Sequence, residues 1–184
     1  MQRELLIGHT RITLIQAEPI DHPRAALYAA ANARGVLASG FGGAIRLAGG
    51  GEVERELRGQ APLLIGSAYS TGPGKLAERG VERIIFGITT SEPGLAPRRD
   101  FADSALRAGL NQIDEARLRS VTFPEVGVRV GGIALTEAAS ILVDALCAQI
   151  RRGSTLDEIV IAGSHLEYLR GCRDALLAMG ASHP

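Results

Sequence analysis

Short apolar runs alternate with longer amphipathic segments along this chain, and that alternation is what most constrains its fold. Apolar runs of strand length occur at residues 4–7, 11–16, 25–31, 63–68, 81–88, 121–123 and 158–162. Segments of helical periodicity occur at 43–58, 101–118, 135–151 and 166–179, the first of them weakened by glycines at 49–51. Strands that alternate with helices of this length predict an α/β fold with a mostly parallel sheet covered on both faces.

Three of the helical segments carry an apolar stripe at helical spacing, which predicts the core-facing side of each helix. The stripes consist of Phe101, Ala105, Leu106, Leu110 and Ile113, then Leu135, Ala139, Leu142, Leu146 and Ile150, then Leu169, Cys172, Leu176 and Met179. The only cysteines, Cys147 and Cys172, lie in such segments without metal-site spacing. We therefore expect two buried core thiols.

Size and charge limit the classes of function. The chain has 184 residues, which predicts a single domain over 1–184, and 46% hydrophobic residues argue against disorder. Its 20 basic and 20 acidic residues cancel, so the charge balance indicates neither nucleic acid nor membrane as a partner. No run approaches the ~20 apolar residues that a membrane span needs, and the N-terminus does not resemble a signal peptide, so we expect a cytoplasmic protein.

A strand that leads into a glycine-rich loop and a helix is the first candidate site. The apolar strand ends at Asn32, and the stretch 38–45 then brings Gly40, Phe41, Gly42 and Gly43 before the helical segment. Glycine lets a ligand approach the backbone, and the first N–H groups of a helix favour an anion. The pattern predicts a phosphate site, with a simple tight connection as the alternative.

The segment after Phe123 is a second glycine-rich loop that leads into a helix. It contains Gly127, Val128, Arg129, Val130, Gly131 and Gly132. Backbone N–H groups and the Arg129 guanidinium make it a candidate diphosphate cradle, unless Arg129 is simply solvated. Because ligands of such sheets bind beyond the carboxyl ends of the strands, we expect the two loops to face one cleft.

Taken in order, these segments resemble the macrodomain family, the ADP-ribose-binding modules of the Appr-1-p processing type. The family's Asn-Ala-Ala-Asn has its counterpart in Ala29 to Asn32, its Gly-Gly-Gly-Val in Ala38 to Phe41, and its Phe-Pro strand end in Phe123-Pro124. The resemblance implies a three-layer α/β/α sandwich with a mixed, mostly parallel central sheet. It also implies that ADP-ribose or a related nucleotide diphosphate is the ligand, with Asn32 at the distal ribose.

The departures from the family's pattern fall on its ligand contacts. Glu18 stands where the family has the aspartate that reads adenine, and Pro19, which follows, has no N–H to donate. Asp21 is an alternative for the adenine-reading role. Ala29 replaces an asparagine, and Ala38 and Ser39 replace glycines, which narrows the cleft. Phe41 either stacks on a ligand ring or fills the core.

The sequence contains no recognisable catalytic arrangement. The four histidines are scattered, the serines lack a triad spacing, and no metal-ligand constellation is visible. Glu125 is the one acid beside the second loop that suits a general base, although a lone glutamate after proline is usually solvated. Three functions stay open: nucleotide binding with little or no hydrolysis, removal of ADP-ribose by hydrolysis, and a scaffold that has lost its ligand. We expect the first, without cofactor or metal, and leave the catalytic residues and the oligomeric state unassigned.

Overall fold

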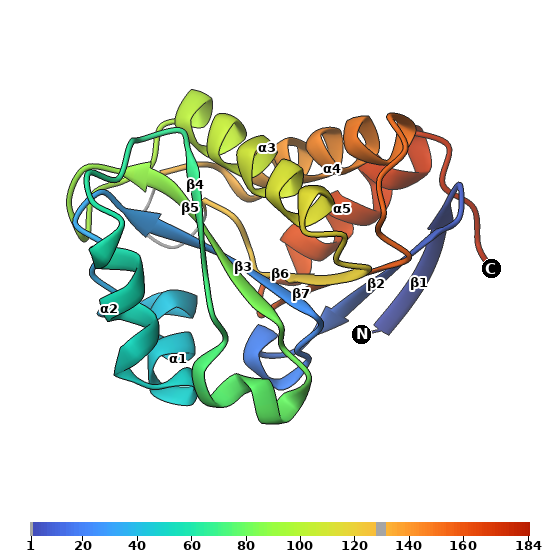
Figure 1. Cartoon of the computed structure of the whole chain (residues 1–184). Coiled ribbons are helices and arrows are strands. Elements are labelled where there is room, and N and C mark those ends of the chain that lie inside the picture. The colour runs from blue at the N-terminus through green and yellow to red at the C-terminus, as the bar shows by residue number, and fades with distance from the viewer. Residues whose placement is uncertain (1, 128–131) are drawn as a thin grey trace.

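A seven-stranded sheet forms the centre of the protein (Figure 1). The computed structural model describes residues 2–127 and 132–184. The strands are β1 Gln2–Ile7, β2 Thr10–Gln16, β3 Ala26–Asn32, β4 Ala68–Thr71, β5 Arg83–Thr90, β6 Ser120–Phe123 and β7 Glu158–Gly163. Their order across the sheet is β1-β2-β7-β6-β3-β5-β4.

The five inner strands run parallel, and the two edge strands run antiparallel to their neighbours. Parallel neighbours need crossover connections, which the helices provide, whereas β1 and β2 are joined by a tight turn with Gly8 at a φ of 59°. The mixed, mostly parallel sheet expected from the sequence is confirmed. All five inner strands therefore present their carboxyl ends at one edge of the sheet.

Helices cover both faces of the sheet (Figure 1). Helices α3 (Arg99–Glu115), α4 (Leu135–Arg151) and α5 (Leu166–Ala178) lie on one face. Helices α1 (Gly40–Gly49) and α2 (Gly51–Gly59) lie on the other, with the 3₁₀ turn η2 (Gly74–Arg79) beside α1. A second 3₁₀ turn, η1 (Pro19–Asp21), follows β2. The result is an α/β/α sandwich.

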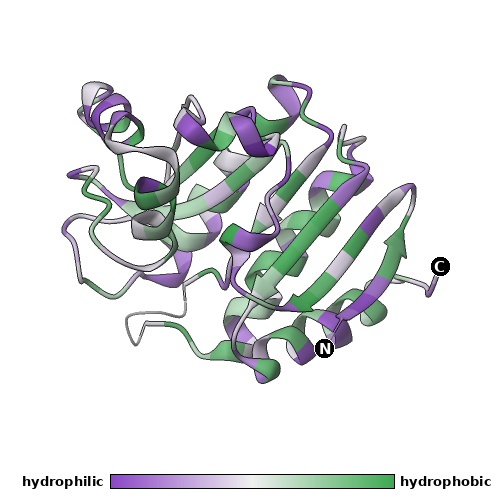
Figure 2. Ribbon diagram, turned by 90° about the horizontal axis from the view of Figure 1, so that it is seen from below, coloured by the Kyte–Doolittle hydropathy of each residue, from purple (hydrophilic) through white to green (hydrophobic). Residues whose placement is uncertain are grey.

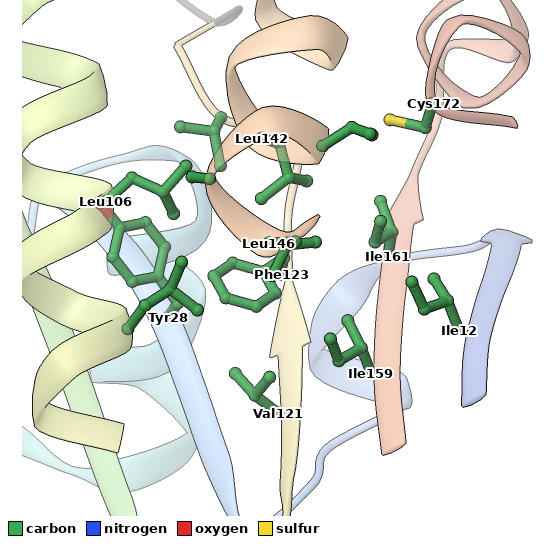
Figure 3. Close-up of a cluster of buried hydrophobic side chains, with 14 of the residues drawn as sticks. Ile12, Tyr28, Leu106, Val121, Phe123, Leu142, Leu146, Ile159, Ile161 and Cys172 are labelled. Carbon is green, nitrogen blue, oxygen red and sulfur yellow. The ribbon is translucent and has the colours of Figure 1, made fainter. Parts of the chain in front are cut away.

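The larger of two hydrophobic cores lies under α3, α4 and α5 (Figure 3). Tyr28 and Phe123 pack against each other at its centre, with ring centroids 5.3 Å apart. Apart from the partly buried Phe101, Leu135 and Met179, the residues of the predicted helical stripes are buried, and all of these except Ala105 belong to this core. Cys147 and Cys172 are both free and buried, as predicted, and burial raises the pKa of the Cys172 thiol to about 12.

Hydropathy follows the layers of the fold (Figure 2). The strands in the middle of the sheet are mostly green, whereas the edge strand β1 is partly purple and the helices carry both colours. Within the part of the chain that the structure describes, no helix is both long and apolar enough to cross a membrane.

Two predicted elements are wrong. Residues 63–68 do not form a strand, because Gly66 adopts a φ of 86° in a turn, and the edge strand β4 begins only at Ala68. The helix predicted over 43–58 is two helices, since Gly50 has a φ of 98° and its N–H closes α1 on the Arg46 carbonyl. The first helix also begins at Gly40 rather than Gly43, so most of the predicted glycine loop is helical.

Candidate functional site

One cleft of about 340 Å³ runs along the carboxyl ends of the inner strands. Its lining includes Glu18 and Pro19 after β2, Gly163 and Ser164 at the end of β7, Pro124 and Glu125 after β6, Ala31 and Asn32 at the end of β3, and Thr89 and Thr90 at the end of β5. Strands lie about 4.8 Å apart, so crossing these five spans roughly 19 Å. The cleft is thus long enough for an extended ligand.

The N-terminus of α1 opens into this cleft. Ser39, the N-cap residue, makes no side-chain capping bond, and the first intrahelical bond runs from the Gly43 N–H to the Ser39 carbonyl. The N–H groups of Gly40, Phe41 and Gly42 therefore have no acceptor in the described part of the chain. Free N–H donors and the helix dipole favour an anionic group at such a helix start.

The glycines of this helix start have different tasks. Gly40 has a φ of 60°, and with Gly42 it lines the cleft. A Cβ on Gly43 would lie 3.3 Å from the Ala38 carbonyl carbon, so Gly43 lets the helix pack on the preceding loop and does not itself line the cleft. Phe41 packs against the smaller core and also lines the cleft, so stacking on a ligand ring stays a prediction.

Asn32 lines the cleft and at the same time holds the turn after β3. Its Nδ2 donates to the Val36 carbonyl at 2.8 Å, and its Oδ1 accepts from the N–H groups of Arg34 and Val36 at 3.1 and 3.3 Å. A register shift between β3 and β5 falls at this residue, which pairs with Thr90 while Ala31 pairs with Ile88. The turn-capping role considered from the sequence is therefore present in the structure.

The loop after β5 supplies lining residues that were not singled out in the sequence. Pro93, Gly94, Leu95 and Pro97 border the cleft together with Thr89, whose hydroxyl donates to the Ala31 carbonyl. This loop carries no glycine motif. Its place in the site could be inferred only from its position after the carboxyl end of a parallel strand, where ligands of such sheets bind.

The structure separates the two carboxylates proposed for the adenine-reading role. Glu18 lines the cleft with an exposed side chain, whereas Asp21, also exposed, is outside the lining. Ala29 is fully buried in the smaller core and does not reach the cleft, so the loss of the family's asparagine there leaves the lining unchanged. Ala38 and Ser39 do line it.

The second glycine loop is described only at its two ends. Gly127 lines the cleft with a φ of 80°. Gly132 lies outside the lining, close to Pro97, whose Cδ would be 2.7 Å from a Cβ at this position. Val128, Arg129, Val130 and Gly131 lie outside the described residues, so their predicted contacts with a diphosphate stay predictions.

Glu125 is buried, contrary to the expectation of a solvated side chain. Only 7% of the side chain is exposed, and it lines the cleft. Its Oε1 accepts the backbone N–H of His165 at 2.7 Å, and its Oε2 lies 2.7 Å from His165 Nδ1. This pair could not be predicted from the sequence, because the two residues are 40 positions apart and meet only where β6 and β7 end side by side.

Ionisable groups are few in this cleft. Among its described lining residues only Glu18 and Glu125 carry such a group, and both lie at the end formed by β2, β7 and β6. The opposite end offers the amide of Asn32 and the hydroxyls of Thr89 and Thr90. In residues 2–127 and 132–184 no three His, Cys, Asp or Glu side chains gather in a way that suits a metal ion.

Comparison with known proteins identifies the family. The sequence profile of the Macro domain matches residues 29–142, which include the second half of β3 and all of α1 and β6. The chain belongs to the macrodomain family. Two uncharacterized proteins are similar to it in sequence. One from Aeropyrum pernix is 32% identical, and the alignment covers 99% of this chain and 92% of that protein. One from Aquifex aeolicus is 35% identical, and the alignment covers 72% of this chain and 74% of that protein.

Solved macrodomain structures share the fold. An Oceanobacillus iheyensis macrodomain with ADP superposes with a TM-score of 0.82 at 17% identity, covering 97% of this chain and 96% of that one. A Trypanosoma brucei macrodomain in complex with ADP-ribose gives 0.77 at 23% identity, covering 90% and 68%. At these identities the likeness is one of fold.

Proposed function

We propose that this macrodomain binds ADP-ribose or a related nucleotide diphosphate in the cleft, with little or no hydrolysis. The observation that carries the proposal is the uncapped N-terminus of α1, whose Gly40, Phe41 and Gly42 N–H groups face the cleft. Such donors favour the oxygens of a diphosphate. The structures of two macrodomains with ADP and with ADP-ribose support the choice of ligand.

The two ends of the cleft suit the two ends of such a ligand. Glu18 and Glu125 offer acceptors at one end, which fits a base that bears N–H donors. Asn32 and the threonines at the other end fit the hydroxyls of a ribose. The proposed contacts are therefore Glu18 and Glu125 with the base, residues 40–42 and Gly127 with the phosphates, and Asn32 with the distal ribose.

Weak or absent hydrolysis follows from where the ionisable side chains lie in the cleft. A general base must lie within hydrogen-bond reach of the water that it activates. At the proposed ribose end, the described lining has no ionisable side chain, and the Asn32 amide already bonds to Arg34 and Val36. We infer that the cleft holds its ligand without a group suited to deprotonate a water there.

A charge placed at the helix start tests the proposal. Ser39→Asp puts a carboxylate on the free N–H groups of α1, which improves capping of the helix but repels a diphosphate. Ser39→Asn is the matched control of nearly equal shape without the charge. By calorimetry we expect ADP-ribose and ADP to bind the wild type, AMP to bind more weakly, and Ser39→Asp to lose at least tenfold in affinity for ADP-ribose without a lower unfolding midpoint.

Two results would contradict this function. If the wild type produces no heat with millimolar ADP-ribose, ADP or NAD, the cleft is not a nucleotide site. If the purified protein releases ADP-ribose from an ADP-ribosylated substrate as fast as a hydrolytic macrodomain measured in parallel, this protein is a hydrolase and the proposal of binding alone is wrong. Equal affinities of Ser39→Asp and Ser39→Asn would place the phosphates away from α1.

A further inference from the structure

Of the two carboxylates in the described lining of the cleft, Glu125 is the one held by hydrogen bonds. Two bonds from His165 fix its carboxylate, one from the backbone N–H and one at Nδ1. Its side chain crosses Gly163 so closely that a Cβ there would overlap Oε1 and lie 2.6 Å from Cδ. Behind it, the buried Tyr168 hydroxyl accepts the N–H of Val126, the residue that follows Glu125. Each neighbour restricts the rotamer of Glu125.

Glu18, the other carboxylate at this end, is free to move. Its side chain is exposed and makes no hydrogen bond within the described residues. Ordering such a side chain on a ligand costs rotamer entropy, which Glu125 has already lost on folding. A preorganised acceptor binds its partner at lower cost than a mobile one.

The chemistry of Glu125 defines its partner. A carboxylate has about four acceptor positions, of which His165 occupies two. Phe41, at the start of α1, is the one aromatic side chain in the described lining. The contact that Glu125 itself can supply is a hydrogen bond to the edge of a base.

We propose that Glu125 is the specificity-determining residue of the cleft, which accepts a hydrogen bond from the exocyclic amino group of the ligand's base. Gly163 and His165 are the positioning residues that hold its carboxylate. This inference rests on the proposed nucleotide binding and goes beyond it, because it assigns base selection to the end of β6 and not to Glu18.

Glu125→Gln isolates the acceptor. The glutamine keeps the side-chain length, and its carbonyl keeps the bond from the His165 N–H, but an amino group replaces Oε2. The ligands are ADP and purine riboside 5′-diphosphate, which lacks the exocyclic amino group. We expect Glu125→Gln to lower the affinity for ADP by 10- to 100-fold, because one hydrogen bond to a charged group is lost. The affinity for the purine analogue should change less than threefold. Glu18→Gln is the comparison variant, and we expect it to change the ratio of the ADP affinity to the analogue affinity less than threefold.

Gly163→Ala tests the positioning role. Gly163 ends β7 with ordinary backbone geometry, so alanine adds no backbone strain and acts by pushing the Glu125 carboxylate aside. We expect this variant to lower the ratio of ADP to analogue affinity as Glu125→Gln does. A loss of stability alone would reduce both affinities together and leave the ratio unchanged.

The outcomes separate this inference from the function on which it rests. Failure of the wild type to bind ADP contradicts the proposed function and this inference with it. Binding by the wild type with equal discrimination in Glu125→Gln contradicts the inference alone. Loss of discrimination in Glu18→Gln instead would assign base reading to Glu18.

Discussion

At the scale of single residues, Asn32 links the fold to the site. Three hydrogen bonds to the backbone of residues 34 and 36 hold the loop that leads from β3 to α1. Asparagine after a strand, before glycine residues, is a signal that the sequence alone supplies. The Asn32 amide both holds a turn and borders the cleft. This double role depends on the conformation of the loop, which the spacing of residues in the sequence does not determine.

Replacing Asn32 should therefore change stability as well as binding. We expect Asn32→Ala to lower the free energy of unfolding by about 1–2 kcal/mol, because the Val36 carbonyl and two N–H groups lose their partner. Urea unfolding measures the change. Asn111→Ala, an exposed asparagine in α3, is the control and should stay within about 0.5 kcal/mol of the wild type. Equal stabilities of the two variants would show that these bonds do not hold the turn.

Tyr28 is a second residue whose role could not be foreseen. Its hydroxyl is fully buried in the larger core without a hydrogen-bond partner in the described part of the chain, and burial raises its pKa. A Cβ on Gly87 would overlap this hydroxyl and lie 2.8 Å from Cζ. Gly87 therefore provides the space on the α3 side of β5 that the Tyr28 side chain occupies.

Opposite effects of one substitution at two tyrosines test this account. Tyr28→Phe removes an unpaired buried hydroxyl, so we expect a gain of about 1 kcal/mol in the free energy of unfolding. Tyr168→Phe removes the acceptor of the Val126 N–H and should lose about 1 kcal/mol. Gly87→Ala should cost about 1–3 kcal/mol, and less in the Tyr28→Phe background. A loss of stability in Tyr28→Phe would mean that its hydroxyl has a partner.

At the scale of elements, apolar periodicity was a good guide to the inner strands and the long helices, and a poor one at glycines. The stripes of α3, α4 and α5 are buried as predicted, because long amphipathic segments have one arrangement that buries them. The errors at Gly50 and Gly66 arise from positive φ values, which only the surrounding packing selects. Glycine permits both signs of φ, so sequence alone leaves such boundaries open.

Asp114 shows how one side chain joins several elements. From the end of α3 its carboxylate accepts bonds from Gln149 near the end of α4 and from Ser154 and Thr155 before β7. Partial burial alone would raise the pKa of this carboxyl, but the hydrogen bonds outweigh it and the pKa is lowered. Since the folded pKa lies below the unfolded one, the stabilisation is present above about pH 4 and is lost as the pH falls through the folded pKa.

The pH dependence of Asp114→Asn follows from this sign. The asparagine NH₂ would face the Gln149 amide donor, so we expect a loss of about 1–3 kcal/mol in the free energy of unfolding near pH 7. Urea titrations from pH 7 to pH 2.5 should show this deficit constant above about pH 5 and shrinking below about pH 4. Asp103→Asn, which breaks only a surface pair with Arg107 on the same helix, should cost less than about 0.5 kcal/mol. A deficit that persists unchanged to pH 2.5 would contradict the assigned pKa shift.

At the scale of the whole molecule, one sheet belongs to two cores and to the cleft. Strands β3 and β5 contribute side chains to both cores, and their carboxyl ends also line the cleft. The parallel sheet and the position of the cleft were predictable, because parallel strands bring their loops to one edge. The Glu125–His165 pair was not, because it depends on β6 and β7 being neighbours, an order that the sequence does not reveal.

A shared sheet predicts that a ligand stabilises the molecule as one unit. A ligand at one hundred times its Kd adds about 2.7 kcal/mol to the free energy of unfolding. For a chain of this size, 1 kcal/mol raises Tm by about 2–4 °C, so we expect saturating ADP-ribose to raise it by about 5–10 °C. Circular dichroism and tyrosine fluorescence should report the same shift, since Tyr28 and Tyr168 lie in the larger core and Tyr69 packs against the smaller.

Ser39→Asp is the control for this experiment, because it should keep the Tm of the free protein and lose the shift with ADP-ribose. Two separate transitions, of which the ligand moves only one, would contradict the coupling of the cores through β3 and β5. That result would assign the site to the smaller core with α1 and would separate it thermally from the layer of α3, α4 and α5. A common shift instead means that the strand ends transmit binding to both faces of the sheet.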